Sequence, residues 1–337
     1  MTAVSVVLSA YNSPLVVTQL ESIANQTLAP SEVVLVNDSS DPEIGRLIDA
    51  TVERLRLVAP SIDFVVRHNA ANLGMYASYS WALERASSPI IAMCDHDDVW
   101  LPNKLAATAP VVELTGRAAC HDVSVFYGDG PAPSVPDGQR LSELSCWKNH
   151  AAFDGKTISV PLLLRRNRLS GTSLVVPAAL RSHILPLPRD IFPDHWIALV
   201  AATRVGLQWD DRPLVHYRRH NGNTVALGGK VRGLRDVYAA VSNDTERRLG
   251  EAARPEFRRD VAEWAALARW RNSASTGEGR VASARSLLRC PRAVRFYLGP
   301  KGVIGDLARL ALIRSEPRTG SPVVCMHTDE ALQSNRD

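Results

Sequence analysis

The stretch "PIIAMCDHDDVWLPNKL", residues 89–105, joins an apolar run to a dense group of acids. The apolar part predicts a buried strand over 89–95, and Asp95, Asp97 and Asp98 follow it directly. Carboxylates this close repel one another unless a positive charge lies among them. Hard oxygen ligands in this pattern favour a divalent cation at the end of the strand. The alternative is a helix N-cap, which would use one carboxylate and leave the others without a role.

The segments before this strand alternate between short apolar runs and amphipathic runs. The apolar runs are rich in β-branched residues and read as strands, and apolar residues at helical spacing fill the segments between them. Such an alternation predicts an α/β fold with a mostly parallel, Rossmann-like sheet flanked by helices. The predicted strands are 3–12, 31–40 and 62–69, and the predicted helices are 13–28, 41–59 and 74–87.

Polar side chains follow three of the predicted strands at the point where each strand ends. Tyr11 and Asn12 follow the first strand, Asn37 and Asp38 close the second, and the acids 95–98 follow the fourth. In parallel sheets the carboxyl ends of the strands meet at one edge, where ligands bind. The sequence therefore predicts one binding site at that edge, built from all three groups.

Beyond residue 115 the regular alternation gives way to a mixed pattern. We expect strands over 118–128 and 170–177, a helix over 192–206, and a strand followed by a polar turn over 207–223. From about residue 230 the chain reads as Arg-rich helices. The predicted organisation is an α/β domain over 1–228, a helical extension over 229–318 and a flexible tail over 319–337.

Composition narrows the class of protein. The chain has 337 residues, 45% hydrophobic and 22% charged, which is typical of a globular protein. Its five cysteines are widely spaced without a C-x-x-C pair, and the N-terminus lacks the features of a signal peptide, so we expect a reduced, cytoplasmic protein. No apolar run reaches the ~20 residues of a membrane span.

Basic residues concentrate at the C-terminal end. From residue 230 onward there are 20 Lys and Arg against 13 Asp and Glu. A solvated helix face explains this excess, and so does an anionic surface, such as the inner face of a membrane contacted peripherally. Aromatic residues are not interleaved with the basic ones, which argues against a nucleic-acid partner.

An ordered set of motifs carries a family resemblance. "VSVVLSAYN", "SIANQTLAPSEVVLVNDSS", "NLGMYASYSWALERASSPIIAMCDHDDVWLPNKL", "SGTSLVV", "PDHWIALVAA" and "PLVHYRRHNGN" cover roughly residues 3–225. They resemble the inverting family-2 glycosyltransferases of the GT-A fold, and within these the bacterial rhamnosyltransferase-like members of cell-surface polysaccharide pathways. The resemblance implies a nucleotide-sugar donor, a Mn²⁺ or Mg²⁺ ion and direct displacement with inversion at the anomeric carbon. It also implies a glycan or lipid-linked acceptor and a role in cell-wall or other surface polysaccharide biosynthesis.

The resemblance assigns the nucleotide site to the ends of the first four strands. Asp38 matches the aspartate that reads the nucleotide base, although Asn37 stands where the family often has another aspartate. Asn72 lies in a family N-x-G motif whose role is donor binding or purely conformational. Asp95 falls where the family contacts ribose or metal. The residues expected against the nucleoside are Ser9, Ala10 and Tyr11.

The resemblance also assigns the chemistry. Asp97 matches the metal-binding carboxylate of the D-x-D motif, and His220 lies in a Tyr-Arg-x-His pattern whose imidazole would complete the metal shell or play a structural role. Asp194 matches the catalytic base, with a helix N-cap as the alternative. The family often has a histidine before this aspartate, and this chain has Pro193.

Three further residues are expected near the reacting groups. Trp196 follows the predicted base closely and is a candidate to stack on an acceptor sugar. Arg218 and Arg219 are candidates to pair with a phosphate.

Two other classes of function remain as alternatives. A sugar nucleotidyltransferase shares the α/β architecture, but it needs a Gly-rich loop with a basic residue after the first strand, and "SAYNSPL" has neither. A non-catalytic nucleotide- or sugar-binding module would lack the carboxylate at the base position, and Asp194 is present.

Overall fold

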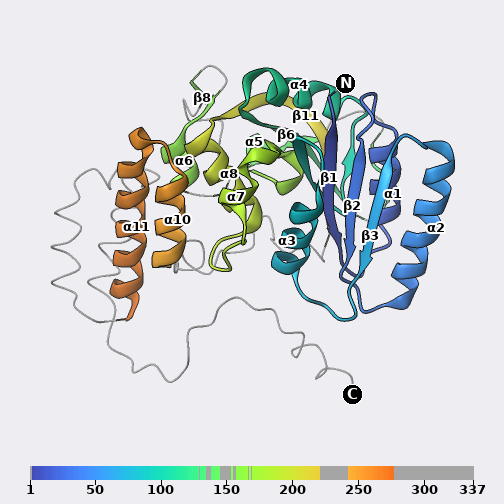
Figure 1. Cartoon of the computed structure of the whole chain (residues 1–337), viewed down its shortest axis with the longest axis horizontal. Helices are drawn as coiled ribbons and strands as arrows, with labels where there is room; N and C mark the ends of the chain where they lie inside the picture. Colours follow the sequence, from blue (N-terminus) through green and yellow to red (C-terminus); the bar gives the residue numbers. More distant parts are fainter. Residues whose placement is uncertain are drawn as a thin grey trace.

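The fold is built around one mixed sheet. A computed structural model describes residues 2–128, 130–133, 138–144, 153–154, 157–165, 167, 169–220 and 242–276. The strands follow the order β3-β2-β1-β4-β10-β6-β11-β9-β8, with β5 paired to β11 and β7 paired to β6 (Figure 1). The strands are β1 (Val4–Ala10), β2 (Glu32–Asn37), β3 (Asp63–His68), β4 (Ile90–Asp95), β5 (Val99–Trp100), β6 (Ala118–Tyr127), β7 (Gln139–Arg140), β8 (Phe153–Asp154), β9 (Thr157–Ile158), β10 (Val175–Pro177) and β11 (Leu207–Arg219).

The first half of the sheet confirms the predicted alternation. Strand β1 pairs in parallel with β2 and β4, and β2 pairs in parallel with β3. Buried side chains on both faces of β1 and β2 explain their continuous apolar runs. The connecting helices are α1 (Val16–Ala24), α2 (Pro42–Val58) and α3 (Met75–Arg85).

The second half of the sheet departs from pure parallel order. Strand β10 runs antiparallel between β4 and β6, and β11 returns to parallel pairing with β6. The predicted strand over 170–177 is wrong at its start, because Gly171–Ser173 forms a 3₁₀ turn, η2, and β10 begins only at Val175. The remaining helical elements are α4 (Lys104–Thr115), α5 (Leu141–Leu144), α6 (Val160–Arg165), η3 (Ala178–Leu180), α7 (Arg181–Ile184), α8 (Pro193–Arg204), α10 (Asn243–Ala252) and α11 (Pro255–Thr276).

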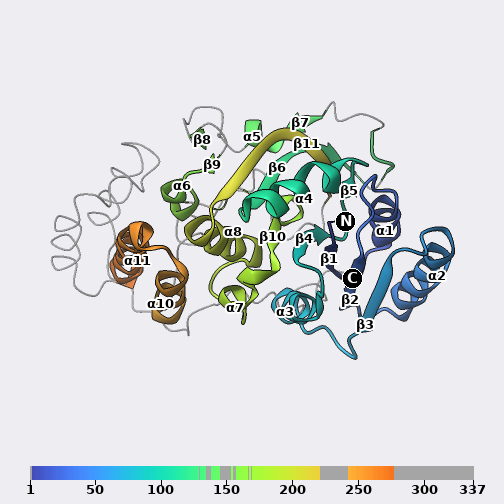
Figure 2. The ribbon, with the colours of Figure 1, turned by 45° about the horizontal axis from the view of Figure 1, so that its top comes forward.

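Helices cover both faces of the sheet and create two apolar layers. One layer joins α1, α2 and α4 to the sheet, and the other joins α3, α6, α8, α10 and α11 to it. Figure 2 shows α1 and α2 at the end of the molecule opposite α10 and α11. The edge where β1, β2 and β4 end therefore lies between two packed layers.

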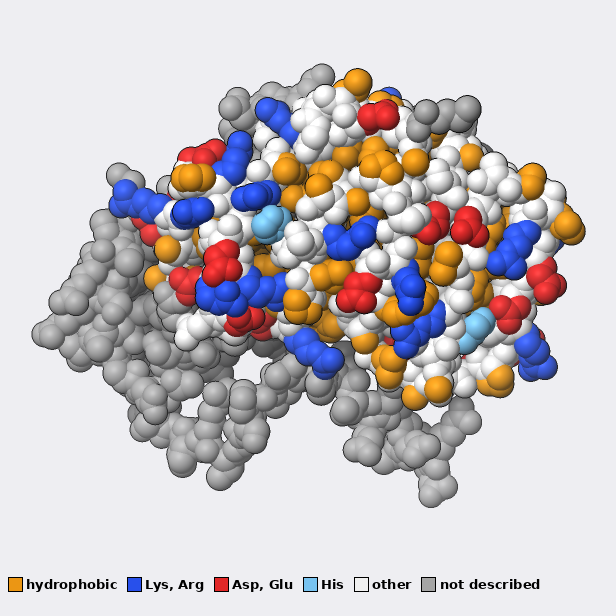
Figure 3. All heavy atoms as spheres, viewed as in Figure 1, with side chains coloured by type: hydrophobic (Ala, Val, Ile, Leu, Met, Phe, Trp, Pro, Cys, Tyr) orange, Lys and Arg blue, Asp and Glu red, His pale blue; other side chains and the backbone are white. Residues whose placement is uncertain are grey.

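The described part of the C-terminal extension consists of α10 and α11, which pack against α8 and α6. Arg247 on α10 pairs with Asp244 and Glu251 of the same helix, and on the face shown in Figure 3 basic and acidic side chains are interspersed in this region. This pattern is typical of a solvated helix face. Residues 229–241 and 277–318 of the predicted extension, and the predicted tail 319–337, lie outside the described residues, so the domain boundaries stay predictions. Among the described residues, no helix combines the length and apolarity that crossing a membrane requires.

A buried polar network closes the end of the sheet opposite the strand ends considered above. Ser5 is fully buried at the start of β1 and donates to Glu32 Oε2 over 2.5 Å, and the Ser88 N–H donates to Ser5 Oγ. Glu32 also accepts from the backbone N–H and the hydroxyl of Ser87. The network thus joins β1, β2 and the turn before β4.

We predict that Glu32→Ala lowers the free energy of unfolding by about 2 kcal/mol, because the buried Ser5 hydroxyl loses its acceptor. Chemical denaturation measures this loss. Glu43→Ala is the control, since Glu43 forms only an exposed ion pair with Arg46 and its loss should cost less than about 0.5 kcal/mol. Equal effects of the two substitutions would contradict the structural role of the network.

Candidate functional site

Asp38 organises the loop that enters α3. Its backbone N–H donates to Ala10 O, which continues the β1–β2 pairing past the strand end. Its Oδ1 accepts from Asn69 Nδ2 at 2.7 Å and from the Leu73 N–H at 2.8 Å, and its Oδ2 accepts from the Gly74 N–H at 2.8 Å. The carboxylate thus fixes residues 69–74 at the strand ends, and base recognition by Asp38 stays a prediction.

Asn72 and Gly74 shape the same loop. Asn72 Oδ1 accepts from the Gly74 N–H at 2.8 Å, and Gly74 has φ +80°, a conformation that side chains disfavour. Asn72 and Gly74 thus shape the turn into α3, and contact between Asn72 and the donor stays a prediction.

The three residues expected against the nucleoside end β1 beside this loop. Ser9 lies in register with Asp95 of β4, Ala10 is buried, and Tyr11 is 37% exposed. Of the three, Tyr11 offers the largest surface to a ligand.

Asp95 lies at the centre of the site. Tyr79 Oη is 3.1 Å from Asp95 Oδ1, and the Thr172 backbone N–H also donates to the carboxylate. Burial, together with the charges of Asp97 and Asp194, raises the pKa of Asp95 to about 7. Asp97, two residues further along the chain, and Asp194, from α8, therefore both act on the Asp95 carboxyl at this edge.

Asp194 faces Asp95 across a glycine. A Cβ on Gly171 would lie 3.4 Å from Asp194 Cβ and 3.5 Å from Asp95 Oδ1. Gly171 therefore lies close to both residues and places no side chain against them. This glycine belongs to the 3₁₀ turn η2, so the departure from the predicted strand lies at the site itself.

The first turn of α8 holds the Asp194 carboxylate. Its Oδ1 accepts from the His195 N–H at 2.7 Å, and its Oδ2 accepts from Asn167 Nδ2 at 2.9 Å. Burial raises the pKa of Asp194, and these two hydrogen bonds oppose the shift. The N-cap alternative is wrong, because the N-cap residue is Phe192 and Asp194 lies inside the helix.

Asp97 and His220 form a pair at the mouth of the site. His220 Nε2 lies 2.9 Å from Asp97 Oδ2, and both side chains are largely buried. In the part of the chain that the structure describes, no three His, Cys, Asp or Glu side chains form a metal-binding group. A carboxylate with an imidazole still fits a divalent ion that takes its other ligands from a diphosphate and water. Metal ligation by this pair stays a prediction.

Arg218 supports the acidic loop from behind. Its side chain is 1% exposed, and it donates from Nε to Asp97 O at 2.8 Å and from Nη1 to the carbonyl oxygens of Gly128 and Gly130. Its backbone N–H donates to Asp98 Oδ1 at 2.9 Å. The predicted phosphate contact of Arg218 is therefore wrong, because backbone carbonyls already bind the buried guanidinium. The helix N-cap considered for one carboxylate of the stretch 95–98 is also wrong, since α4 begins at Lys104 with Asn103 as its N-cap.

Trp196 belongs to the core. Its side chain has no exposed surface, and its Nε1 donates to Ile184 O at 2.8 Å. The predicted stacking of Trp196 on an acceptor sugar is therefore wrong. Arg219 is 8% exposed with its guanidinium 5.8 Å from the Tyr217 ring centre, and its phosphate contact stays a prediction.

Sequence reasoning missed several residues of the site. Tyr79 and Asn167 hold the two central carboxylates, and Gly171 separates them. Lys104 is fully buried over the Trp100 ring, where burial lowers its pKa to about 7 against the opposing charges of nearby acids. A lysine directly after the acidic stretch was a usable signal, whereas Asn167 lies far from the motifs in the sequence.

We predict that Arg218→Met lowers the free energy of unfolding by about 3 kcal/mol, because three carbonyl oxygens lose a charged donor. Thermal or chemical unfolding measures the loss. The control is Arg212→Met on the same strand, where an exposed ion pair with Asp210 contributes at most about 1 kcal/mol. A stable Arg218→Met protein with weakened nucleotide binding would instead support the phosphate contact.

Comparisons with known proteins agree with this geometry. Residues 5–160 match the model of "Glycosyl transferase family 2". The chain is 30% identical over 111 residues to the uncharacterized glycosyltransferase YwdF of Bacillus subtilis, which covers 33% of this chain and 38% of the relative. It is 33% identical over 129 residues to the uncharacterized protein y4gI of Sinorhizobium fredii, covering 37% of this chain and 13% of that protein. The chain thus spans well under half the length of these curated relatives.

Solved structures agree on the fold. TarS 1–349 of S. aureus in complex with UDP-GlcNAc superposes with a TM-score of 0.54 at 17% identity, covering 81% of this chain and 73% of that one. The chain therefore has the GT-A fold, and its residues 5–160 are similar to the glycosyltransferase family 2 model.

Proposed function

We propose that this protein is an inverting glycosyltransferase that moves a sugar from a nucleotide-diphosphate donor to a hydroxyl group of a glycan or lipid-linked acceptor. The observation that carries the proposal is that Asp95 at the end of β4 and Asp194 in the first turn of α8 lie close together beside Gly171. The family match of residues 5–160 supports it.

In the proposed reaction Asp194 is the general base. It takes the proton of the acceptor hydroxyl as that oxygen attacks the anomeric carbon, and the bond between this carbon and the donor's diphosphate breaks with its electron pair. Attack from the face opposite the leaving group inverts the configuration. A raised pKa suits the role, because the carboxylate then accepts a proton more readily.

Asp97 and His220 would hold a Mn²⁺ or Mg²⁺ ion, which supplies positive charge to the diphosphate of the donor. Arg218 keeps the backbone of Asp97 fixed for this purpose. Helix α3 begins with Met75 and Tyr76 and carries no basic residue before Arg85. The start of this helix therefore provides no positive side chain that could help to neutralise the diphosphate.

The donor and the acceptor are proposed only by class. The TarS structure contains UDP-GlcNAc, and the resemblance in the sequence favours dTDP-rhamnose, so UDP- and dTDP-sugars are the first candidates. The proposed setting is surface polysaccharide or glycoconjugate synthesis at the cytoplasmic side of the membrane, with peripheral contact to it. A nucleotidyltransferase would release pyrophosphate instead of a nucleoside diphosphate, and a binding module would release neither.

We predict that one nucleotide-sugar in a panel of UDP-, GDP- and dTDP-sugars raises the melting temperature with Mn²⁺ and fails to do so with EDTA. Asp97→Ala should lose this shift, because it removes the carboxylate proposed to bind the ion. The matched control is Asp49→Ala, an exposed carboxylate whose partner is His68. No shift with any nucleotide would contradict the proposed donor class.

We further predict that the acidic limb of the pH profile of kcat/KM lies above pH ~4, the ordinary range of an aspartate. The base acts when deprotonated, so a raised pKa moves the limb to higher pH. Asn167→Ala removes a hydrogen bond that lowers the pKa of Asp194, and the limb should move up again. Asp194→Asn should abolish transfer. A limb that stays in place or moves down in Asn167→Ala would contradict the base role.

A further inference from the structure

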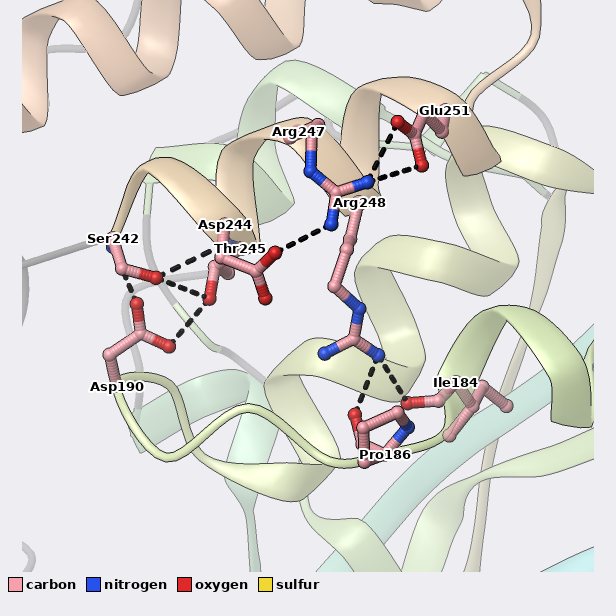
Figure 4. Close-up of polar contacts among 9 residues, drawn as sticks. All are labelled: Ile184, Pro186, Asp190, Ser242, Asp244, Thr245, Arg247, Arg248 and Glu251. Atoms are coloured by element: carbon pink, nitrogen blue, oxygen red, sulfur yellow. Dashed lines mark hydrogen bonds and ion pairs between the residues drawn. The ribbon is translucent and has the colours of Figure 1, made fainter.

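Helix α10 contacts the loop that leads into Asp194, although more than forty residues separate them in the sequence. The loop is residues 185–192, between α7 and α8, and we call it the base loop. Figure 4 shows that its polar contacts come from one face of α10. The base loop ends directly before Pro193 and Asp194, so its position decides where the carboxylate lies.

The start of α10 holds the middle of the base loop. Asp190 Oδ2 accepts from the Ser242 backbone N–H at 2.5 Å, and its Oδ1 accepts from the Thr245 hydroxyl at 2.7 Å. The Ser242 hydroxyl in turn caps the helix by accepting from the Thr245 N–H. A carboxylate at a helix N-terminus is also favoured by the helix dipole.

The middle of α10 holds the beginning of the base loop. Arg248 Nη2 donates to Pro186 O at 2.6 Å and lies 3.3 Å from Ile184 O (Figure 4). Its guanidinium lies 5.2 Å from the ring centre of Trp196, whose Nε1 donates to the same Ile184 oxygen. Arg248 therefore contacts both the base loop and the residue two positions after Asp194.

The end of α10 is tied to the far end of α8. The Arg254 N–H donates to Thr203 O at 3.0 Å, and Arg204 Nη1 donates to Ala252 O at 3.4 Å. Leu249 and Ala252 are buried between these polar contacts. Helix α10 is thus attached to α8 at one end and to the base loop at the other.

We propose that α10 positions the Asp194 carboxylate, with Thr245 and Arg248 as its positioning residues. This inference rests on the proposed function, because it assigns the C-terminal helices a part in glycosyl transfer. Neither residue touches the carboxylate. They act by fixing the base loop before Pro193, through Asp190 and the carbonyl oxygen of Pro186, and Arg248 also lies over the Trp196 ring after it. Asp194 is thereby held facing Asp95 beside Gly171.

The test uses the full chain with Thr245→Val and Arg248→Met combined. Thr245→Val replaces only the hydroxyl of a buried side chain by a methyl group, and Arg248→Met keeps an unbranched apolar stem but lacks the guanidinium and its donors. The control is Arg247→Met on the same helix, because Arg247 pairs only with Asp244 and Glu251 of α10 (Figure 4).

The first readout, hydrogen–deuterium exchange, is independent of activity. In the double variant, exchange over residues 187–196 should rise roughly 5- to 30-fold, because the hydrogen bonds that close the base loop are lost. Exchange in β1 and α1 and in the Arg247→Met control should not change. An unchanged base loop, or a rise throughout the chain, would overturn the inference.

The second readout separates positioning from stability. The kcat for sugar transfer should fall roughly 10- to 100-fold, while the affinity for the nucleotide-sugar stays the same, because a displaced base slows the reaction without touching the donor. Arg248→Lys in place of Arg248→Met should recover part of kcat. Faster exchange with an unchanged kcat would overturn the positioning role. If the wild-type protein transfers no sugar, the proposed function fails, and the exchange data alone decide whether α10 fixes the base loop.

Discussion

Mutual repulsion between carboxylates is the constraint on which the structure of this site depends. The parallel strands bring Asp95 and Asp97 to one edge, and α8 adds Asp194, so three acids act on one another in a poorly solvated space. The protein balances part of this charge from within. The Arg218 guanidinium donates to the Asp97 carbonyl oxygen, and its backbone N–H donates to the Asp98 carboxylate. The buried Lys104 lies close enough to influence Asp95 and Asp98. Burial is the largest cause of the raised pKa of Asp95, and the charges of Asp97 and Asp194 add to it, so the proposed cation would offset negative charge that the protein itself leaves in place.

The nearness of Asp95 and Asp194 explains why a 3₁₀ turn occurs at Gly171–Ser173, where the sequence predicted a strand. A strand continued through residues 170–173 would point alternate side chains away from its plane, toward the neighbouring acids. The 3₁₀ turn instead brings Gly171 between Asp95 and Asp194 and lets the Thr172 N–H donate to Asp95. The same turn offers the Thr172 hydroxyl to Trp100 Nε1, which links the acidic loop to the core. The turn thus places a residue without a side chain beside the two carboxylates, donates a hydrogen bond to Asp95 and accepts one from Trp100.

Periodicity predicted the sheet well, because strands buried on both faces leave continuous apolar runs and their ends carry the polar groups. It also located Asp38, Asp95, Asp97 and Asp194 on the correct elements. It failed where partners come from distant segments. Arg218 looked like a phosphate ligand, but its donors are taken by the carbonyl oxygens of Asp97, Gly128 and Gly130. Trp196 looked accessible beside the proposed base, yet a helix buried along most of its length places its ring in the core. The residues next to Arg218 and Trp196 in the sequence reveal neither the distant carbonyl oxygens that bind the guanidinium nor the burial of the ring.

The C-terminal helix α10 bears on how Asp194 is kept close to the other acids. An acid kept poorly solvated and near other acids would move toward solvent if its backbone were free to do so. Asn167 and the first turn of α8 hold the Asp194 side chain, but they do not fix the turn itself. That task needs contacts with the backbone before Pro193, and these come from α10 through Asp190, Ile184 and Pro186. We first interpreted the many arginines of the extension as a solvated face or a membrane contact. Arg248 has a different role in the proposal. Its charge is directed at carbonyl oxygens inside the molecule, where it resists the displacement that repulsion favours.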